Sequence, residues 1–153
     1  MHYQPQHDLL QNRIILVTGA PDGIGKEAAV TYARHGAHLV LLGRNDEKLH
    51  QVAQHIHQQG YPLPHCVVLD MATATRADCD AVAQQVEAMV PRLDGVLHNA
   101  GVLGDIVPMD QQQEARWLEV MQVNVNATFF LTQALLPLLL KSDSGSLVFT
   151  TSS

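Results

Sequence analysis

Three glycines stand close together in the stretch VTGAPDGIG, residues 17–25, between an apolar run and a helical pattern. A glycine-rich turn that joins a strand to a helix lets the backbone approach a phosphate, and the helix N-terminus attracts the anion. Gly19 permits the tight turn, Gly23 permits the close approach of a pyrophosphate, and Gly25 lets the helix pack against the strand. The turn therefore predicts a phosphate-binding site.

Two kinds of phosphate site use such a turn. A nucleoside-triphosphate loop has the pattern G-x-x-x-x-G-K-[ST]. Gly25 and Lys26 would then need a glycine at position 20, which is Ala20, and a serine or threonine at position 27, which is Glu27. The spacing T-G-x-x-x-G-x-G, which begins at Thr18, suits a dinucleotide instead. A plain strand–helix turn with incidental glycines remains the alternative.

The elements that must position this turn follow from the apolar pattern. Apolar runs of strand length without polar alternation indicate strands buried on both faces, as in a parallel sheet covered by helices. Such runs alternate with helical patterns, which predicts a doubly wound parallel α/β fold. Strands are expected at residues 13–18, 38–42, 65–69, 94–98 and 146–150, and helices at about 25–36, 45–60, 75–90 and 112–140.

Composition limits the classes of partner. The 153 residues fit one domain, and 46% hydrophobic and 16% charged residues are ordinary for a soluble globular protein. The net charge of −6, without a basic run, argues against nucleic acid. The uncharged segment 120–140 carries several Asn and Gln residues, so we expect a buried helix and no membrane partner.

Cysteine and histidine do not form a metal-binding pattern. The two cysteines, Cys66 and Cys79, are too few for a disulfide framework or a metal site. The closest histidine pair, His55 and His57, is spaced two residues apart and would point to different faces of a helix. We therefore expect no metal, and free thiols in a reducing compartment, the cytoplasm.

Further motifs accompany the glycine turn. LLGRN places Arg44 just past the second strand, VVLDM places Asp70 at the end of the third, and HNAG spans residues 98–101. MQVNVNATF holds Asn124 in the last helix, and GSLVFTTSS forms the fifth strand and a serine doublet. In order and spacing these motifs resemble the N-terminal portion of the short-chain dehydrogenase/reductase family. The resemblance implies a Rossmann fold with strand order 3-2-1-4-5 and a hydride-transferring oxidoreductase acting on a small carbonyl or secondary alcohol.

The resemblance implies a set of cofactor-binding residues. Arg44 would pair with the 2′-phosphate of NADP(H), because a guanidinium binds phosphate bidentately, so NADP(H) is expected in preference to NAD(H). Asp22 argues against this preference for NADP(H), since many NADP(H)-binding members of the family carry Lys or Arg at this position. Each of three residues also has a structural alternative. Arg44 could be an ordinary solvated side chain, and Asp70 could be the N-cap of the next helix. Asn99 could tie neighbouring strands together. The full set comprises Thr18, Gly19, Gly23, Ile24, Gly25, Arg44, Asp70, Met71, Asn99, Ala100 and Gly101.

Two residues are expected to take part in catalysis. Asn124 lies in an apolar helix and needs a hydrogen-bonding reason to be there; by resemblance it bends the helix and extends a proton relay. Ser152 aligns with the family's catalytic serine, whose hydroxyl bonds the substrate carbonyl. The alternative for Ser152 is a polar strand end. His98 replaces an asparagine that is common in the family, and we expect little consequence from this exchange.

The family's general acid, the tyrosine of Y-x-x-x-K, has no match here. The tyrosines Tyr3, Tyr32 and Tyr61 are followed four residues later by His, Gly and His. We therefore expect residues 1–153 to be a single NAD(P)-binding Rossmann domain, truncated after strand five, incomplete at the C-terminus and nearly inactive alone. A non-enzymatic nucleotide-binding fragment, such as a partial gene product, is the alternative.

Truncation would also leave apolar surface uncovered. The fifth strand would be an open edge, and we expect Val96, Leu97, Val148 and Phe149 to meet water or another chain. By resemblance the long fourth helix contributes to a homodimer or homotetramer interface. Side chains between residues 117 and 140 are therefore expected to be underburied.

Overall fold

A single parallel sheet forms the centre of the computed structural model, which describes residues 4–152. Its strands are β1 (Ile14–Thr18), β2 (His38–Gly43), β3 (His65–Val68), β4 (Gly95–His98) and β5 (Ser146–Phe149). The spatial order β3-β2-β1-β4-β5 confirms the predicted order. In the register, Leu16 lies opposite Val40 on one side and Val96 on the other. The order in which successive strands join the sheet reverses between β1 and β4, and folds of this kind bind ligands at that point.

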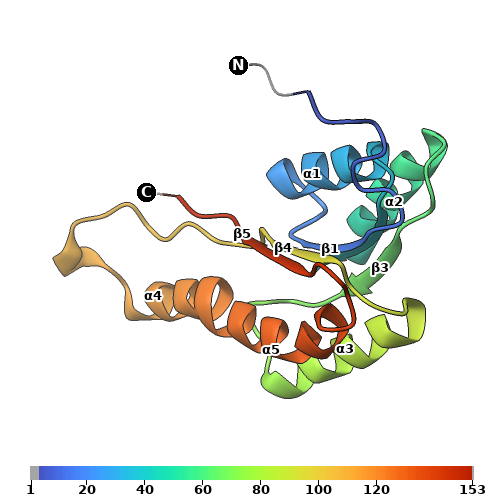
Figure 1. Cartoon of the computed structure of the whole chain (residues 1–153). Coiled ribbons are helices and arrows are strands. Elements are labelled where there is room, and N and C mark those ends of the chain that lie inside the picture. The colour runs from blue at the N-terminus through green and yellow to red at the C-terminus, as the bar shows by residue number, and fades with distance from the viewer. Residues whose placement is uncertain (1–3, 153) are drawn as a thin grey trace.

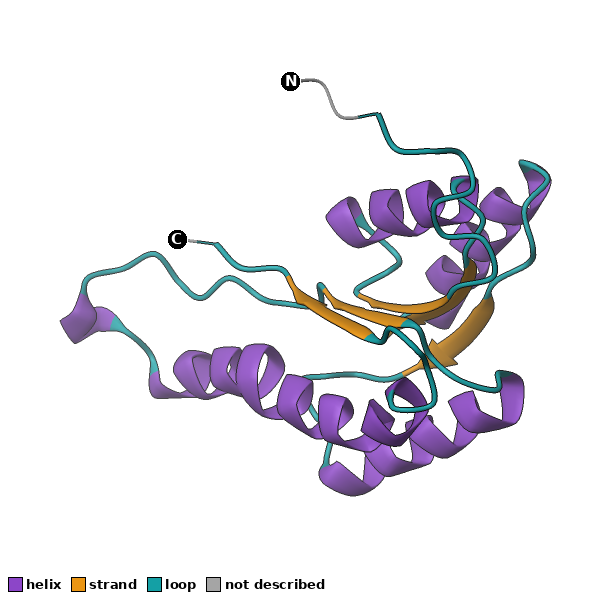
Figure 2. Ribbon diagram, viewed as in Figure 1, coloured by secondary structure: helices purple, strands orange, loops and turns teal. Residues whose placement is uncertain are grey.

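Helices cover both faces of the sheet (Figures 1 and 2). Helices α1 (Gly23–Arg34) and α2 (Asp46–Gln58) lie on one face. Helices α3 (Arg76–Met89), α4 (Glu114–Met121) and α5 (Thr128–Leu139) lie on the other. Alternate strand residues enter two separate cores: Leu16 packs on the α3–α5 side and Val17 on the α1–α2 side. Burial on both faces, predicted from the apolar runs, is confirmed for β1, β2 and β4.

Local sequence signals fix the starts of two helices. Asn45 precedes α2, and its side-chain oxygen accepts a hydrogen bond from the Lys48 backbone amide at 2.9 Å. Thr75 precedes α3 and forms a reciprocal capping box with Asp78. The bonds from Thr75 lower the pKa of Asp78 from its usual value. These caps set where each helix departs from the carboxyl end of a strand.

The predicted fourth helix is continuous but not uniform. Helix α4 passes into a π-helical turn, η2 (Gln122–Ala127), which passes into α5. The segment before it, with a short 3₁₀ turn η1 (Met109–Gln111), projects from the body as the longest connection (Figure 1). No helix within residues 4–152 has both the length and the apolar character needed to cross a bilayer.

The edge strands depart from the prediction of full burial. All of β5 and most of β3 are at least partly exposed, because each has a neighbouring strand on one side only. Val148 and Phe149 are each 49% exposed, as expected for an open edge. The expected exposure of Val96 and Leu97 is wrong: each is buried, in the α3–α5 core and the α1–α2 core respectively.

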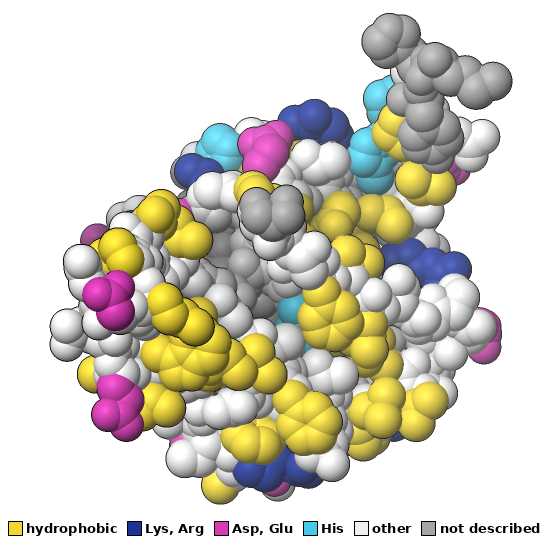
Figure 3. All heavy atoms as spheres, turned by 90° about the vertical axis from the view of Figure 1, so that its left-hand side faces the viewer, with side chains coloured by type: hydrophobic (Ala, Val, Ile, Leu, Met, Phe, Trp, Pro, Cys, Tyr) yellow, Lys and Arg dark blue, Asp and Glu magenta, His cyan; other side chains and the backbone are white. Residues whose placement is uncertain are grey.

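The outer face of α4 and α5 carries exposed apolar side chains. Trp117, Leu118 and Phe129 are 55%, 57% and 60% exposed, which confirms the expected underburial of this stretch. Figure 3 views the molecule from the side where α4 and the preceding loop lie, and hydrophobic side chains are spread widely over this face. The inner residues of α5, by contrast, are fully packed; Leu131 and Leu135 have no exposed surface.

Candidate cofactor site

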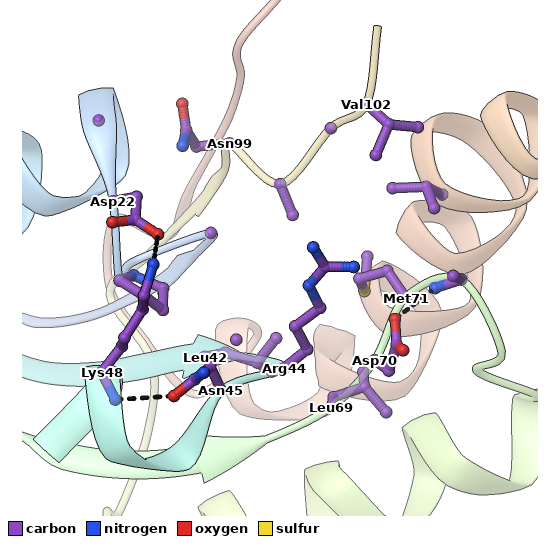
Figure 4. A pocket seen from close by; sticks show the side chains of 18 of the residues that line it. Asp22, Leu42, Arg44, Asn45, Lys48, Leu69, Asp70, Met71, Asn99 and Val102 are labelled. Carbon is purple, nitrogen blue, oxygen red and sulfur yellow. Dashed lines mark hydrogen bonds and ion pairs between the residues drawn. The ribbon is translucent and has the colours of Figure 1, made fainter. Parts of the chain in front are cut away.

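A cavity of about 570 Å³ opens at the carboxyl ends of the central strands (Figure 4). It lies between the glycine turn after β1, the start of α2, the segment after β3 and the segment after β4. This is the position where doubly wound folds bind nucleotides. Most of the predicted cofactor-binding residues line it: Gly19, Gly23, Ile24, Arg44, Asp70, Met71, Asn99, Ala100 and Gly101.

The glycine turn is compact in ways that a side chain would prevent. Gly19 has φ +65°, and a Cβ atom there would lie 3.0 Å from the Ala100 backbone. A Cβ atom on Gly25 would lie 2.3 Å from the Gly19 carbonyl oxygen and 2.8 Å from Asn99 Nδ2. Gly25 does not line the cavity; it lets α1 pack against the turn, as predicted. The turn and the β4 end therefore form one close-packed floor.

Thr18, which was predicted to bind the cofactor, lies beneath the cavity lining. It is fully buried and does not line the cavity. Its hydroxyl oxygen accepts hydrogen bonds from the Asn99 amide at 3.0 Å and the Ala100 amide at 2.9 Å. Thr18 therefore supports the segment after β4 through two hydrogen bonds, and its place in the cofactor-binding set stays a prediction.

Two basic side chains reach the cavity, Arg44 from the connection between β2 and α2 and Lys48 from the first turn of α2. The Arg44 guanidinium extends into it, and Lys48 lies at its rim (Figure 4). Lys48 Nζ donates a hydrogen bond to Asp22 Oδ2 at 2.9 Å. Sequence reasoning missed Lys48. Its signal was the position four residues after Arg44, in the first turn of a helix that starts at the carboxyl end of a strand.

Asp70 and Asn99 follow the carboxyl ends of β3 and β4, which are separated in the sheet by β2 and β1. Asp70 Oδ1 accepts a hydrogen bond from the Ala72 amide at 3.0 Å, whereas the N-cap of α3 is Thr75, so the N-cap alternative for Asp70 is excluded. Asn99 Oδ1 accepts from the Thr150 hydroxyl at 3.0 Å, which ties the end of β4 to the end of β5. The strand-tying alternative for Asn99 is therefore confirmed, while the residue also lines the cavity.

Asn124 does not line the cavity itself but holds a residue that does. It lies in the π-helical turn, where its Oδ1 accepts from the Val102 amide at 2.9 Å and its Nδ2 donates to the Val102 carbonyl at 3.0 Å. Val102 lines the cavity, but Asn124 does not. The predicted hydrogen-bonding reason for Asn124 is thus the fixing of this backbone segment.

Ser152 is not brought to the cavity. It follows β5 as an exposed residue, and the lining residue of that segment is Thr150. Its neighbour Ser153 lies outside the described residues. Across residues 4–152, no group of three or more His, Cys, Asp or Glu side chains is arranged to hold a metal ion.

His98 lies in the core and contacts two neighbouring elements. It ends β4, is 4% exposed, and stacks on Phe149 of β5 with ring centroids 5.0 Å apart. Its Nε2 lies 2.9 Å from the Thr132 hydroxyl of α5, while its buried Nδ1 has no partner within residues 4–152. Burial lowers the pKa of His98 to about 4. The ring therefore joins β4, β5 and α5.

Comparison with known proteins agrees with this architecture. Residues 13–153 match the family model described as short chain dehydrogenase. The whole chain is 65% identical to the uncharacterized oxidoreductase YciK of Escherichia coli K12, of which it spans 61%.

Solved structures agree as closely. A short chain dehydrogenase of E. coli CFT073 complexed with NADPH has a TM-score of 0.95 and 64% identity, over 97% of this chain and 62% of that one. A short chain dehydrogenase of Shigella flexneri 2a complexed with NADP has a TM-score of 0.94 and 62% identity, over 96% and 62%. By sequence and by fold, the chain belongs to the short-chain dehydrogenase family.

Proposed function

We propose that residues 1–153 form the NAD(P)-binding domain of an NADP(H)-dependent oxidoreductase, which transfers hydride between nicotinamide and a small carbonyl or secondary alcohol. The observation that carries the proposal is a cavity that joins the N-terminus of α1 to the Arg44 guanidinium. A dinucleotide carrying a 2′-phosphate needs both features. The glycine floor, which a Cβ atom would obstruct, also fits this ligand. The bound cofactor would supply the hydride.

Each part of the cavity receives a role in this proposal. The α1 N-terminus holds the pyrophosphate, Asp70 and the Met71 amide bind the adenine, and residues 99–101 face a ribose. Asn124 orders this last segment through its bonds to Val102. Ser152 is proposed to bond the substrate carbonyl. The group that protonates that carbonyl is not assigned among these residues.

The preference for NADP(H) over NAD(H) rests on the charges at the end of β2. Gly43 and Arg44 stand where a carboxylate would hold a ribose 2′-hydroxyl. The residue that argues against this preference, Asp22, is paired with Lys48 at 2.9 Å. Its charge is therefore offset at the rim of the cavity.

A titration with both cofactors tests the proposal. Arg44→Leu should weaken NADPH binding by about 10- to 100-fold, the loss expected for charged hydrogen bonds, and change NADH binding by less than about threefold. Arg34→Leu, in the last turn of α1 and away from the cavity, removes the same charge as a control. Fluorescence titration of the chain measures both affinities. Equal loss for the two cofactors, or no NADPH binding by the unmodified chain, would contradict the proposal.

A second candidate is a nucleotide-binding module without catalysis. The exposure of Ser152 outside the cavity favours it. NADPH binding without carbonyl reduction by this chain would support the module, and reduction above a no-enzyme control would exclude it.

For the whole protein we propose a homodimer or homotetramer that uses the exposed face of α4 and α5. The unpaired thiols Cys66 and Cys79 support a cytoplasmic location.

A further inference from the structure

Asp22 stands at the start of α1 and lines the cavity with its carboxylate. Its backbone, at φ −139° and ψ 165°, has the extended conformation of a capping residue. An aspartate in this position ordinarily accepts hydrogen bonds from amides two or three residues later, here Ile24 and Gly25. No such side-chain cap is formed. The carboxylate instead accepts the bond from Lys48 Nζ (Figure 4).

The position of Lys48 favours contact with an anionic side chain. It is in the first turn of α2, at the positive end of the helix dipole, where a cation is disfavoured. The two acidic residues of the same turn have other partners: Asp46 lies 3.1 Å from His50, and Glu47 accepts from Gln51. Lys48 therefore reaches Asp22 and joins the starts of α1 and α2 across the rim of the cavity.

Because the Asp22 carboxylate contacts Lys48, the first backbone amides of α1 have no capping acceptor. The earliest backbone hydrogen bond of the helix runs from the Lys26 amide to the Asp22 carbonyl at 3.2 Å. Within the described residues, the amides of Gly23, Ile24 and Gly25 have no protein acceptor. These are the N–H groups that a pyrophosphate would use. A capping carboxylate would place a fixed negative charge in the same position.

We propose that Lys48 is a positioning residue that holds the Asp22 carboxylate away from the α1 N-terminus and so keeps the pyrophosphate position open. The inference rests on the proposed cofactor function. The Asp22 and Lys48 side chains are 73% and 51% exposed, so their ion pair is weak and comparable with a helix cap. Loss of Lys48 therefore lets Asp22 turn onto the helix and compete with the cofactor.

A double-mutant cycle tests this competition. Lys48→Met should weaken both NADPH and NADH by about fivefold to tenfold, because the pyrophosphate is common to both. In an Asp22→Ala background the same change should cost less than about twofold, since no carboxylate is left to cap the helix. Lys48→Arg should retain the affinity. Lys141→Met, which breaks the exposed 2.9 Å pair with Glu87, is the matched control.

Two further measurements distinguish a positioning role of Lys48 from a purely structural one. The melting temperature of cofactor-free Lys48→Met should equal or exceed that of the unmodified chain, because a cap is gained. Its crystal structure should show the Asp22 carboxylate on the Ile24 or Gly25 amide. A lowered melting temperature, equal losses in both Asp22 backgrounds, or a loss confined to NADPH would each overturn the inference. Failure of the unmodified chain to bind either cofactor would overturn the proposed function itself.

Discussion

The proton on the buried ring of His98 can be assigned from its neighbours. The Thr132 hydroxyl has one hydrogen, which it donates to the Thr128 carbonyl at 2.7 Å. Towards His98 Nε2, 2.9 Å away, the same oxygen must therefore accept, so the ring carries its proton on Nε2. Nδ1 remains a buried acceptor without a partner within residues 4–152. A second proton on this ring would bring an unpaired charge into the core.

This arrangement predicts a loss of stability in mild acid. The folded-state pKa of His98, about 4, lies below the ordinary value of 6.5. Between pH 4 and pH 6.5 the ring is therefore protonated in the unfolded chain but not in the folded chain. The free energy of unfolding should fall by about 3 kcal/mol as the pH drops from 6.5 to 4, and this residue should add nothing below pH 4. Urea denaturation should show this slope, and His98→Asn should lack it. Parallel curves for both proteins above pH 4 would contradict the assignment.

At the level of the elements, the sequence predicts what depends on local patterns. Apolar runs locate the strands, and Asn45 marks the start of α2, because both signals act over a few residues. The π-helical turn is not predictable in this way, since its hydrogen bonds span five residues instead of four and the change is confined to a six-residue stretch. The Asp22–Lys48 pair also escapes prediction, because its partners come from different strand–helix units. The edge exposure of β5 depends on which strands flank it, so it was expected from the strand order that the family resemblance implies and not from a local pattern.

The π-helical turn should be coupled to the segment after β4. Asn124→Ala removes both hydrogen bonds to Val102, so the free energy of unfolding should fall by about 1–2 kcal/mol. The Val102 amide should also exchange its hydrogen faster, by about tenfold. Asn126→Ala is the control within the same turn, because within residues 4–152 its side-chain amide donates only a long bond to Gln122 at 3.4 Å. Hydrogen exchange followed by NMR measures the effect; equal acceleration in both variants would disprove the coupling.

In the whole molecule, the two ends of the sheet have opposite characters. The carboxyl ends of the strands border the open cavity, where polar groups such as Arg44 and Asp22 are exposed. At the amino ends, Asp94 is buried and accepts from the Ile14 amide at 2.8 Å, Arg92 Nε at 2.9 Å and the Ser142 hydroxyl at 2.6 Å. One carboxylate thus joins the starts of β1 and β4 to the segment before β5. A rigid base of this kind supports a site whose own residues must stay open to a ligand.

Asp94 should therefore control stability in strong acid, in a range separate from that of His98. Burial by itself would raise the pKa of Asp94, but hydrogen bonds from Arg92, Ser142 and Ile14 lower it from 3.8 to about 2. The charged form stabilises the fold above pH 3.8, and about 2.5 kcal/mol should be lost in total, most of it as the pH falls from 3.8 to 2.

Asp94→Asn should remove this acid-dependent loss and lower stability at pH 7 by about 2–3 kcal/mol, because Arg92 loses its buried partner. Asp110→Asn, at an exposed position in η1, should leave the curve unchanged. Urea denaturation at several pH values measures both variants. If Asp94→Asn followed the unmodified chain below pH 3.8, the base of the sheet would be held by packing rather than by this carboxylate. In that case the two ends of the sheet would differ only in their exposure.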